Sequence, residues 1–237
     1  MTKRRGKSSK AEKIIFGTVM ILMVGSFVYA LLRAIYVPVE ANQNGELLTR
    51  NDYLLMTVSS FAAIIVLLLP SFLERKWKFD IPSTMHVIFI LFIFTGVFLG
   101  EFRRFHFHVA NFDKWLHIVS GGALAAISFS LVSLLNKKDI IKMNPLFIAL
   151  FSFSFALMVG VLWEIYEFAW DYHFDFNMQK YATSSGELLI GQTALYDTMM
   201  DFVADAIGAS SVSLLGYLAV KNNWLWIDHL LIKKIVD

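Results

Sequence analysis

The chain of 237 residues contains no cysteine and little charge, and both shortages narrow what it can be. Without cysteine it has neither a disulfide framework nor a thiolate metal site. Charged residues make up 17% and hydrophobic residues 57% of the sequence, whereas soluble domains average about 25% and about 45–50%. The 4 prolines and 13 glycines exclude collagen-like and low-complexity chains. With a mean hydropathy of +0.59, the composition indicates a protein whose solvent is a lipid bilayer.

The motifs of soluble enzymes are absent as well. The sequence has no phosphate-binding loop, no HExxH pair, no serine nucleophile elbow and no dinucleotide-binding glycine pattern. Its net charge is +2, and six of the 21 Lys and Arg residues fall within the first thirteen positions. This clustering indicates membrane topology, so no nucleic-acid partner is expected.

Long apolar runs fill most of the chain. A transmembrane helix needs about 20 mostly apolar residues, and lipid leaves no partner for an unpaired backbone group, so such runs must be helices. We predict an all-α, polytopic membrane bundle in one transmembrane domain, with a basic leader (1–13), a six-helix bundle (14–219) and an interfacial tail (220–237). The predicted spans are Ile14–Val37, Tyr53–Leu73, Met85–Phe102, Trp115–Leu135, Pro145–Trp170 and Thr198–Ala219.

Basic residues in the connections predict the orientation, because Lys and Arg favour the cytoplasmic side. The leader and the stretches around Arg75–Lys78 and Lys137–Lys142 are basic, whereas the connections after the first and fifth spans are mostly acidic. Both termini are therefore expected in the cytoplasm of a multi-pass cell-membrane protein. Trp224, Trp226 and their leucine neighbours predict a helix of the tail on the inner surface. A cleavable signal peptide ending near Ala30 is the alternative for the start.

Acidic residues gather where lipid disfavours them most. They are spaced by three or four residues, which places each group on one helical face, and the predicted orientation puts all groups at the external end. Gly121, Gly122, Gly160 and Gly208 follow about one turn deeper and are expected to let the helices approach beneath the acids. The groups are Asp113 with His117, then Glu164, Glu167 and Asp171, then Asp197, Asp201 and Asp205.

Carboxylates crowded together must share protons, pair with cations or bind a metal. The leading hypothesis is a divalent metal site, because carboxylate oxygens with one imidazole suit such an ion. A proton or cation pathway and a purely structural role remain open as alternatives. The expected ligands are His117, Glu164, Glu167, Asp201 and Asp205, while Asp113, Asp171 and Asp197 are expected nearer the rim or behind the ligands.

The connection before the fourth span breaks the charge rule, because Arg103 and Arg104 fall on the external side. One interpretation is that they bind an anion such as a phospholipid headgroup or a lipid-linked phosphate. The other is pairing with Glu101 and Asp113 or with headgroups. His106 and His108 are more typical of an interface than of a metal site. The long connection 171–197 is of a length typical of lids and binding segments.

Three motifs together resemble a known family: Asp113-Lys114-Trp115-Leu116-His117, then Glu164-Ile165-Tyr166-Glu167, then Asp197 through Asp201 and Asp205 to Gly208. The pattern is similar to the YjdF-like family of uncharacterised bacterial membrane proteins. More distantly it resembles VanZ-like proteins, which are associated with glycopeptide resistance and have a Glu-Gln type pair where this chain has two glutamates. The resemblance covers roughly residues 100–219 and implies a fold without a settled reaction.

Three functions remain open at this stage. The leading hypothesis is a metal site that acts on or binds a lipid or cell-envelope substrate, with the membrane lipids themselves as partners. The second is a small proton- or cation-coupled carrier, although crowding of the acids at one end argues against it. The third is a scaffold or immunity-type protein. The sequence does not predict whether the site is catalytic, nor the oligomeric state.

Overall fold

The computed structural model describes residues 9–36, 40–43, 46–137, 143–183, 185–224 and 232–234. Within them, six helices are long and apolar enough to cross a membrane, which confirms the predicted all-α membrane bundle. Five are α1 (Lys10–Tyr36), α2 (Arg50–Trp77), α5 (Phe112–Lys137), α6 (Pro145–Phe174) and α7 (Gln192–Lys221). The sixth span joins α3 (Ser83–Ile93) to a π-helix, η1 (Phe94–Phe102).

Several helices extend beyond the apolar runs that predicted them. α7 begins at Gln192 rather than near Thr198, and α6 continues to Phe174. The connection between them is therefore Asp175–Gly191, shorter than the predicted 171–197. An apolar run marks only the part of a helix inside the hydrocarbon, and a helix can continue through the headgroup region with polar residues.

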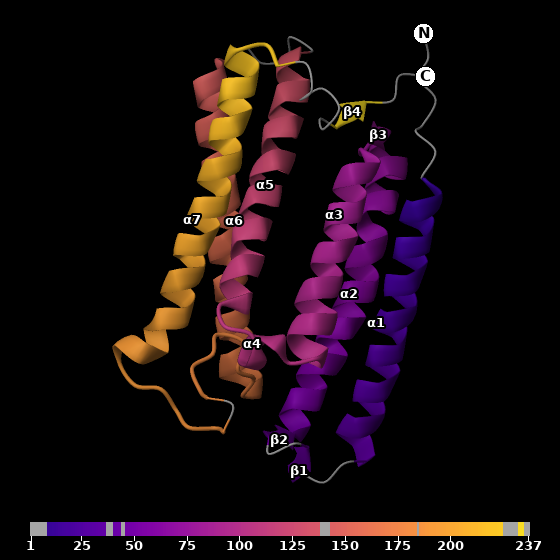
Figure 1. Ribbon diagram of the computed structural model, residues 1–237, viewed down its shortest axis with the longest axis vertical. Coiled ribbons are helices and arrows are strands. Elements are labelled where there is room, and N and C mark those ends of the chain that lie inside the picture. Colours follow the sequence, from indigo (N-terminus) through magenta and orange to yellow (C-terminus); the bar gives the residue numbers. More distant parts are fainter. Residues whose placement is uncertain are drawn as a thin grey trace.

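The helices form two halves (Figure 1). α1, α2 and the α3–η1 span pack together around Met23, Leu67 and Ile90. α5, α6 and α7 pack together around Ala125, Ala156 and Ala209. Each half thus has its own core, and they meet chiefly where α3, η1 and the short helix α4 (Phe105–His108) contact α5.

Small residues bring α5 and α7 into backbone contact. A Cβ at Gly121 would stand 2.5 Å from the carbonyl oxygen of Asp205, and one at Gly208 would overlap the carbonyl of Ile118. A Cβ at Gly160 in α6 would overlap the Asp205 carboxylate. The glycines therefore lie beneath the acids, as the sequence predicts, and α5 and α7 approach as closely as small residues allow.

The π-helix was not predicted. In η1, Phe94, Phe98 and Phe102 stack successively, with ring centroids 5.3 and 5.5 Å apart. Residues four apart align along this wider helix, and π-helical turns are frequent near functional sites. η1 ends at Phe102, and only Arg103 and Arg104 separate it from α4.

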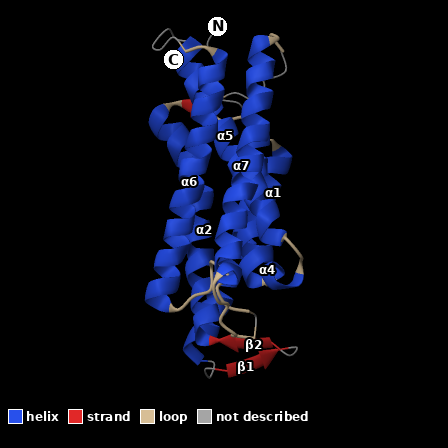
Figure 2. Ribbon diagram, turned by 90° about the vertical axis from the view of Figure 1, so that its left-hand side faces the viewer, coloured by secondary structure: helices blue, strands red, loops and turns tan. Residues whose placement is uncertain are grey.

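Short strands close both ends of the molecule (Figure 2). β1 (Glu40–Gln43) and β2 (Glu46–Thr49) pair antiparallel between α1 and α2. At the other end β3 (Phe79–Asp80) pairs with β4 (Lys233–Lys234), and the Ile232 amide donates to Ser130 Oγ of α5 at 2.6 Å. The tail thus contacts both halves. The predicted tail helix falls largely on residues 225–231, outside the described residues, and 233–234 are extended.

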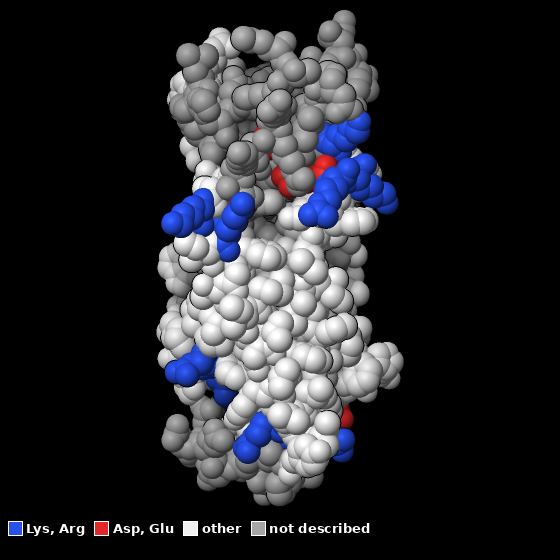
Figure 3. Space-filling view, turned by 90° about the vertical axis from the view of Figure 1, so that its right-hand side faces the viewer, with Lys and Arg blue, Asp and Glu red and all other residues white. Residues whose placement is uncertain are grey.

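The surface fits a membrane-spanning molecule. On the face in Figure 3, Lys and Arg gather towards the two ends, with a broad band of uncharged residues between. Large apolar side chains face outward along the spans, such as Ile21, 74% exposed, and Leu162, 55% exposed. The start of α1 and the end of α7 lie at one end (Figure 1), and the acidic residues of α5, α6 and α7 lie at the other. Which end faces the cytoplasm stays a prediction.

We expect Gly208→Ala to lower the free energy of unfolding by about 1–3 kcal/mol, because the added methyl group overlaps the Ile118 carbonyl. Thermal unfolding in detergent measures the change. Gly25→Ala is the matched control, since a Cβ at Gly25 meets nothing within 4 Å. Equal melting temperatures for the two variants would contradict the close approach of α5 and α7.

The orientation is testable because the chain has no cysteine. Ser185→Cys lies at the acidic end and Arg75→Cys at the opposite end, where α1 begins, and both positions are exposed. In intact cells we expect an impermeant maleimide to label residue 185, and residue 75 only after permeabilisation. The opposite pattern would show that the acidic end faces the cytoplasm.

Candidate metal centre

The candidate site lies at the end of the molecule opposite the start of α1, where α5 and α7 begin and α6 ends. Each helix contributes polar residues from its terminal turns. The Gly121–Asp205 approach fixes the spacing of α5 and α7 directly beneath. The polar side chains therefore project from a tightly packed base.

His117 is the centre of the arrangement and is buried, with 7% exposed. Its Nδ1 atom lies 3.3 Å from Asp205 Oδ2, and its Nε2 atom lies 3.6 Å from Asp201 Oδ1. Both aspartates are 1–2% exposed. Asp205 also accepts a hydrogen bond from Ser120 Oγ at 3.3 Å. The imidazole therefore lies between two carboxylates that come from successive turns of α7.

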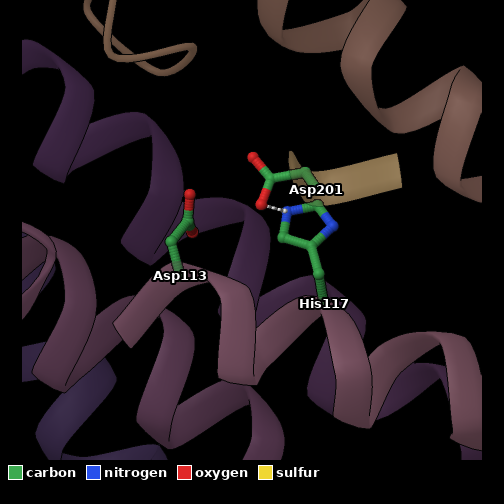
Figure 4. Close-up of side chains that lie close together, drawn as sticks. All are labelled: Asp113, His117 and Asp201. Carbon is green, nitrogen blue, oxygen red and sulfur yellow. Dashed lines mark ion pairs between the residues drawn. The ribbon is translucent and has the colours of Figure 1, made fainter. Parts of the chain in front are cut away.

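Asp113 completes a group with His117 and Asp201 (Figure 4). One ligand atom from each residue lies within 4.8 Å of the others, the only such group of three or more among the described residues. Two carboxylates and an imidazole suit a divalent cation, and three protein ligands leave coordination positions for water or substrate. From the sequence, His117 and Asp201 were expected among the ligands, and Asp113 nearer the rim or behind them.

Lys114 is a resident cation that the sequence analysis missed. Its ammonium lies 2.5 Å from Asp197 Oδ1 and 2.8 Å from Asp201 Oδ1, and it also hydrogen-bonds the Asp197 carbonyl at 3.1 Å. Two carboxylates of α7 are thus tied to α5 by one side chain. Lys114 is three residues before His117, so helical spacing alone would have placed it on the same face.

Glu164 of α6 is 3% exposed and faces the same region. Its Oε2 atom accepts hydrogen bonds from Thr198 Oγ1 at 2.9 Å and Gln179 Nε2 at 3.3 Å. Its Oε1 atom is buried and has no hydrogen bond with any described group. A buried carboxylate oxygen without a donor is costly, so this atom needs a proton or a cation.

Asp171 holds the α6–α7 connection in place. It is buried, and its two oxygens accept from the backbone amides of Met178 at 2.8 Å and Gln179 at 2.9 Å. This capping brings Gln179 to Glu164. Asp171 is thus bonded to the backbone of the connection and does not face water.

Lys180 follows on the same connection. Its ammonium donates to the carbonyls of Asn177 at 3.3 Å and Met178 at 3.0 Å. Burial acts to lower the pKa of Lys180, but the carboxylates of Glu101, Asp113 and Glu167 outweigh it and raise the pKa above its ordinary value. Lys180 is therefore a second permanent positive charge beside the acids. A lone lysine in a loop gave no signal of this position.

The remaining expected ligand, Glu167, accepts a hydrogen bond from Trp163 Nε1 at 2.8 Å, one turn back along α6. Its carboxylate lies near those of Glu164 and Asp113 without joining the three-residue group. Asp197 is held by Lys114, and its Oδ2 atom has no hydrogen-bond partner among the described residues. A ligand role for Glu167 stays a prediction.

Arg103 and Arg104 lie in different surroundings. Arg104 is 8% exposed; its Nη1 atom lies 3.3 Å from Asp52 Oδ1 of α2, and its guanidinium lies over the Phe107 ring. It therefore links the two halves of the molecule. Arg103 is exposed. Binding of an anion by either arginine stays a prediction.

His106 belongs to the polar cluster and not to the interface, contrary to the expectation for it. Its side chain is 8% exposed and lies between Asp113 and Glu101. A Cβ at Gly100 would stand 2.5 Å from His106 Nε2, so this glycine makes room for the ring. α4 contains only four residues, too few for a helical pattern to predict where its side chains point.

The comparisons with known proteins agree with this architecture. Residues 18–222 match the family described as "Predicted membrane protein (DUF2238)". An uncharacterised protein of Thermotoga maritima is 25% identical over 158 residues, which cover 66% of this chain and 74% of that protein. No solved structure matches. The chain is thus a multi-pass membrane protein that belongs to the DUF2238 family of predicted membrane proteins.

Proposed function

We propose that the protein binds a divalent metal ion at Asp113, His117 and Asp201 and uses it to bind or act on a lipid or cell-envelope substrate. The observation that carries the proposal is the convergence of one imidazole and two carboxylates within 4.8 Å. The sequence motifs of the protein also resemble those of the YjdF-like family, and this resemblance implies no particular reaction.

The surrounding residues fit this chemistry. Asp205 lies against Nδ1 of His117, and a carboxylate that accepts this N–H leaves the Nε2 lone pair directed to the ion, as in many metal sites. Lys114 hydrogen-bonds Asp201 Oδ1, the oxygen that also faces His117 Nε2, and would fix the orientation of this carboxylate. The ligands would then be ordered before the ion binds.

The site also contains a candidate base. Glu164 is buried and hydrogen-bonds Thr198, which lies three residues before Asp201 on α7; its Oε1 atom accepts no hydrogen bond within the described structure. A bound divalent ion polarises a phosphoryl or carbonyl oxygen and lowers the pKa of its water. Glu164 would accept the proton that this water loses, while Thr198 and Gln179 hold its other oxygen.

The location at one end of the spans favours a substrate that reaches the site from the membrane surface. Apolar side chains of the α6–α7 connection are outward there, with Leu188 69% and Ile190 85% exposed. Such residues insert readily into the headgroup boundary. A lipid headgroup or a lipid-linked phosphate therefore fits better than a freely soluble metabolite.

A second candidate, proton- or cation-coupled transport, is favoured by one observation. Lys114 bonds two of the carboxylates directly, so the network is partly neutralised without a metal. Acids and bases alternate from Asp197 through Lys114, Asp201 and His117 to Asp205, as a relay would require. The close packing of α5 and α7 below Asp205 argues against passage through the bilayer.

We expect detergent-purified protein, freed of loosely bound ions, to retain at least one divalent metal per chain by mass spectrometry. Asp201→Asn should lose it, because the amide supplies no negative charge. Asp175→Asn is the matched control, since Asp175 is exposed beyond the end of α6. A folded wild-type protein without metal would refute the proposal and favour the relay.

Lys114→Met removes the cation that separates Asp197 from Asp201. Without metal we expect a loss of about 3–5 kcal/mol of stability, because two carboxylates are left unpaired. Added Mn²⁺ should restore much of the melting temperature by neutralising the same carboxylates. A melting temperature insensitive to Mn²⁺ would show that the carboxylates near Lys114 do not bind the ion.

A further inference from the structure

A second histidine lies against the other oxygen of Asp113. His106 Nδ1 is 3.2 Å from Asp113 Oδ1, and His106 Nε2 is 3.4 Å from Glu101 Oε1. The side chain is 8% exposed, so it is more than nine-tenths buried. Its Nδ1 atom nevertheless makes no hydrogen bond with any described group. The ring is thus held between two carboxylates, one on η1 and one on α5.

His106 and His117 have the same arrangement. Each ring has one carboxylate at each nitrogen: Glu101 and Asp113 for His106, Asp205 and Asp201 for His117. In a metal site, a histidine donates one N–H to a carboxylate and directs the lone pair of its other nitrogen to the ion. Glu101 and Asp205 occupy the position of that accepting carboxylate.

A neutral His106 ring would leave two acceptor atoms facing each other. A neutral imidazole has one N–H and one lone pair. If Nε2–H of His106 is donated to Glu101, the lone pair of Nδ1 faces the lone pairs of Asp113 Oδ1 at 3.2 Å. Two acceptors at this distance repel unless a proton or a metal ion lies between them. A divalent ion satisfies both atoms at once.

Lys114 and Lys180 do not hydrogen-bond Asp113 Oδ1, the oxygen that faces His106. Lys114 lies 3.9 Å from Asp113 Oδ2, the other oxygen of the carboxylate. The hydrogen bonds of Lys180 go to the carbonyls of Asn177 and Met178. Within the described structure, therefore, neither ammonium bonds the oxygen that faces His106.

We infer that Asp113 is a bridging carboxylate in a binuclear divalent metal centre. One ion lies among Asp113, His117 and Asp201, and this half rests on the proposed function. The second ion lies between Asp113 and His106, and Glu101 orients His106. Paired ions about 3.5–4 Å apart bind the oxygens of a phosphoryl group. The substrate class is therefore a phosphate ester or diphosphate, in keeping with a lipid-linked phosphate.

The test is a Mn²⁺ titration of the metal-free full-length protein in detergent, with the affinity tag removed. We expect two Mn²⁺ per chain and an electron paramagnetic resonance spectrum of two coupled ions. His106→Ala should bind one Mn²⁺ and show the spectrum of an isolated ion. His108→Ala is the matched control, because His108 is an exposed histidine of the same short helix; it should behave as the wild type.

Glu101→Gln is a milder variant that keeps the size of the side chain. It should bind the second Mn²⁺ about 10–100-fold more weakly and leave the first unchanged, as expected for a residue that only orients a ligand. This variant decides the question if His106→Ala does not fold.

The outcomes separate the two claims. A wild-type protein that saturates at one Mn²⁺ with an uncoupled spectrum would overturn the binuclear centre and leave the proposed function standing. A wild-type protein that binds none would overturn both. Two coupled ions retained in folded His106→Ala would exclude His106 as the second ligand.

Discussion

The need to neutralise carboxylates at the edge of a bilayer determines the structure of this end of the protein. Asp201, Asp205 and Glu164 are each at most 3% exposed, where an unpaired charge would cost several kcal/mol. Lys114 and His117, both from the first turns of α5, face the two aspartates of α7. The packing of α5 against α7 and the pairing of their charged residues therefore depend on each other.

The glycines make this pairing geometrically possible. A lysine or histidine can reach a carboxylate on the next helix only if the two backbones are close. Gly121 and Gly208 provide that approach between α5 and α7, and Gly160 leaves space for the Asp205 carboxylate. Substitution of these glycines would move the charged groups apart as well as the backbones. The close helix contacts at these glycines and the polar site above them therefore depend on the same packing.

Sequence patterns predicted the six spans and the position of the acidic residues above the glycines, because both depend on local composition and helical spacing. Apolar runs located all six spans, and helical spacing placed the glycines beneath the acids. The patterns did not predict the π-helix η1, because a change of helix type leaves the hydropathy of a segment the same. They did not predict the start of α7 at Gln192, because an apolar run marks only the part of a helix inside the hydrocarbon.

The candidate site was predicted in part. Helical spacing on α5 and α7 predicted that His117 and Asp201 lie close together, and the structure places His117 Nε2 3.6 Å from Asp201 Oδ1. Their role as ligands stays a prediction. The sequence patterns placed Asp113 nearer the rim or behind the ligands, placed His106 at the interface and gave no indication of Lys180. The positions of His106 and Lys180 depend on the turn at α4 and on the loop that Asp171 holds. These positions follow from tertiary contacts that no periodicity contains. The part of the site built by irregular backbone is therefore visible only in the structure.

The most direct measurement of the central claim is an anomalous difference map of crystals grown with Mn²⁺, recorded at the manganese absorption edge. The account predicts a peak within coordination distance of His117, Asp113 and Asp201. A well-ordered map without such a peak, in which Lys114 alone meets the carboxylates of α7, would contradict it. The site would then be a self-neutralised network of acids and bases.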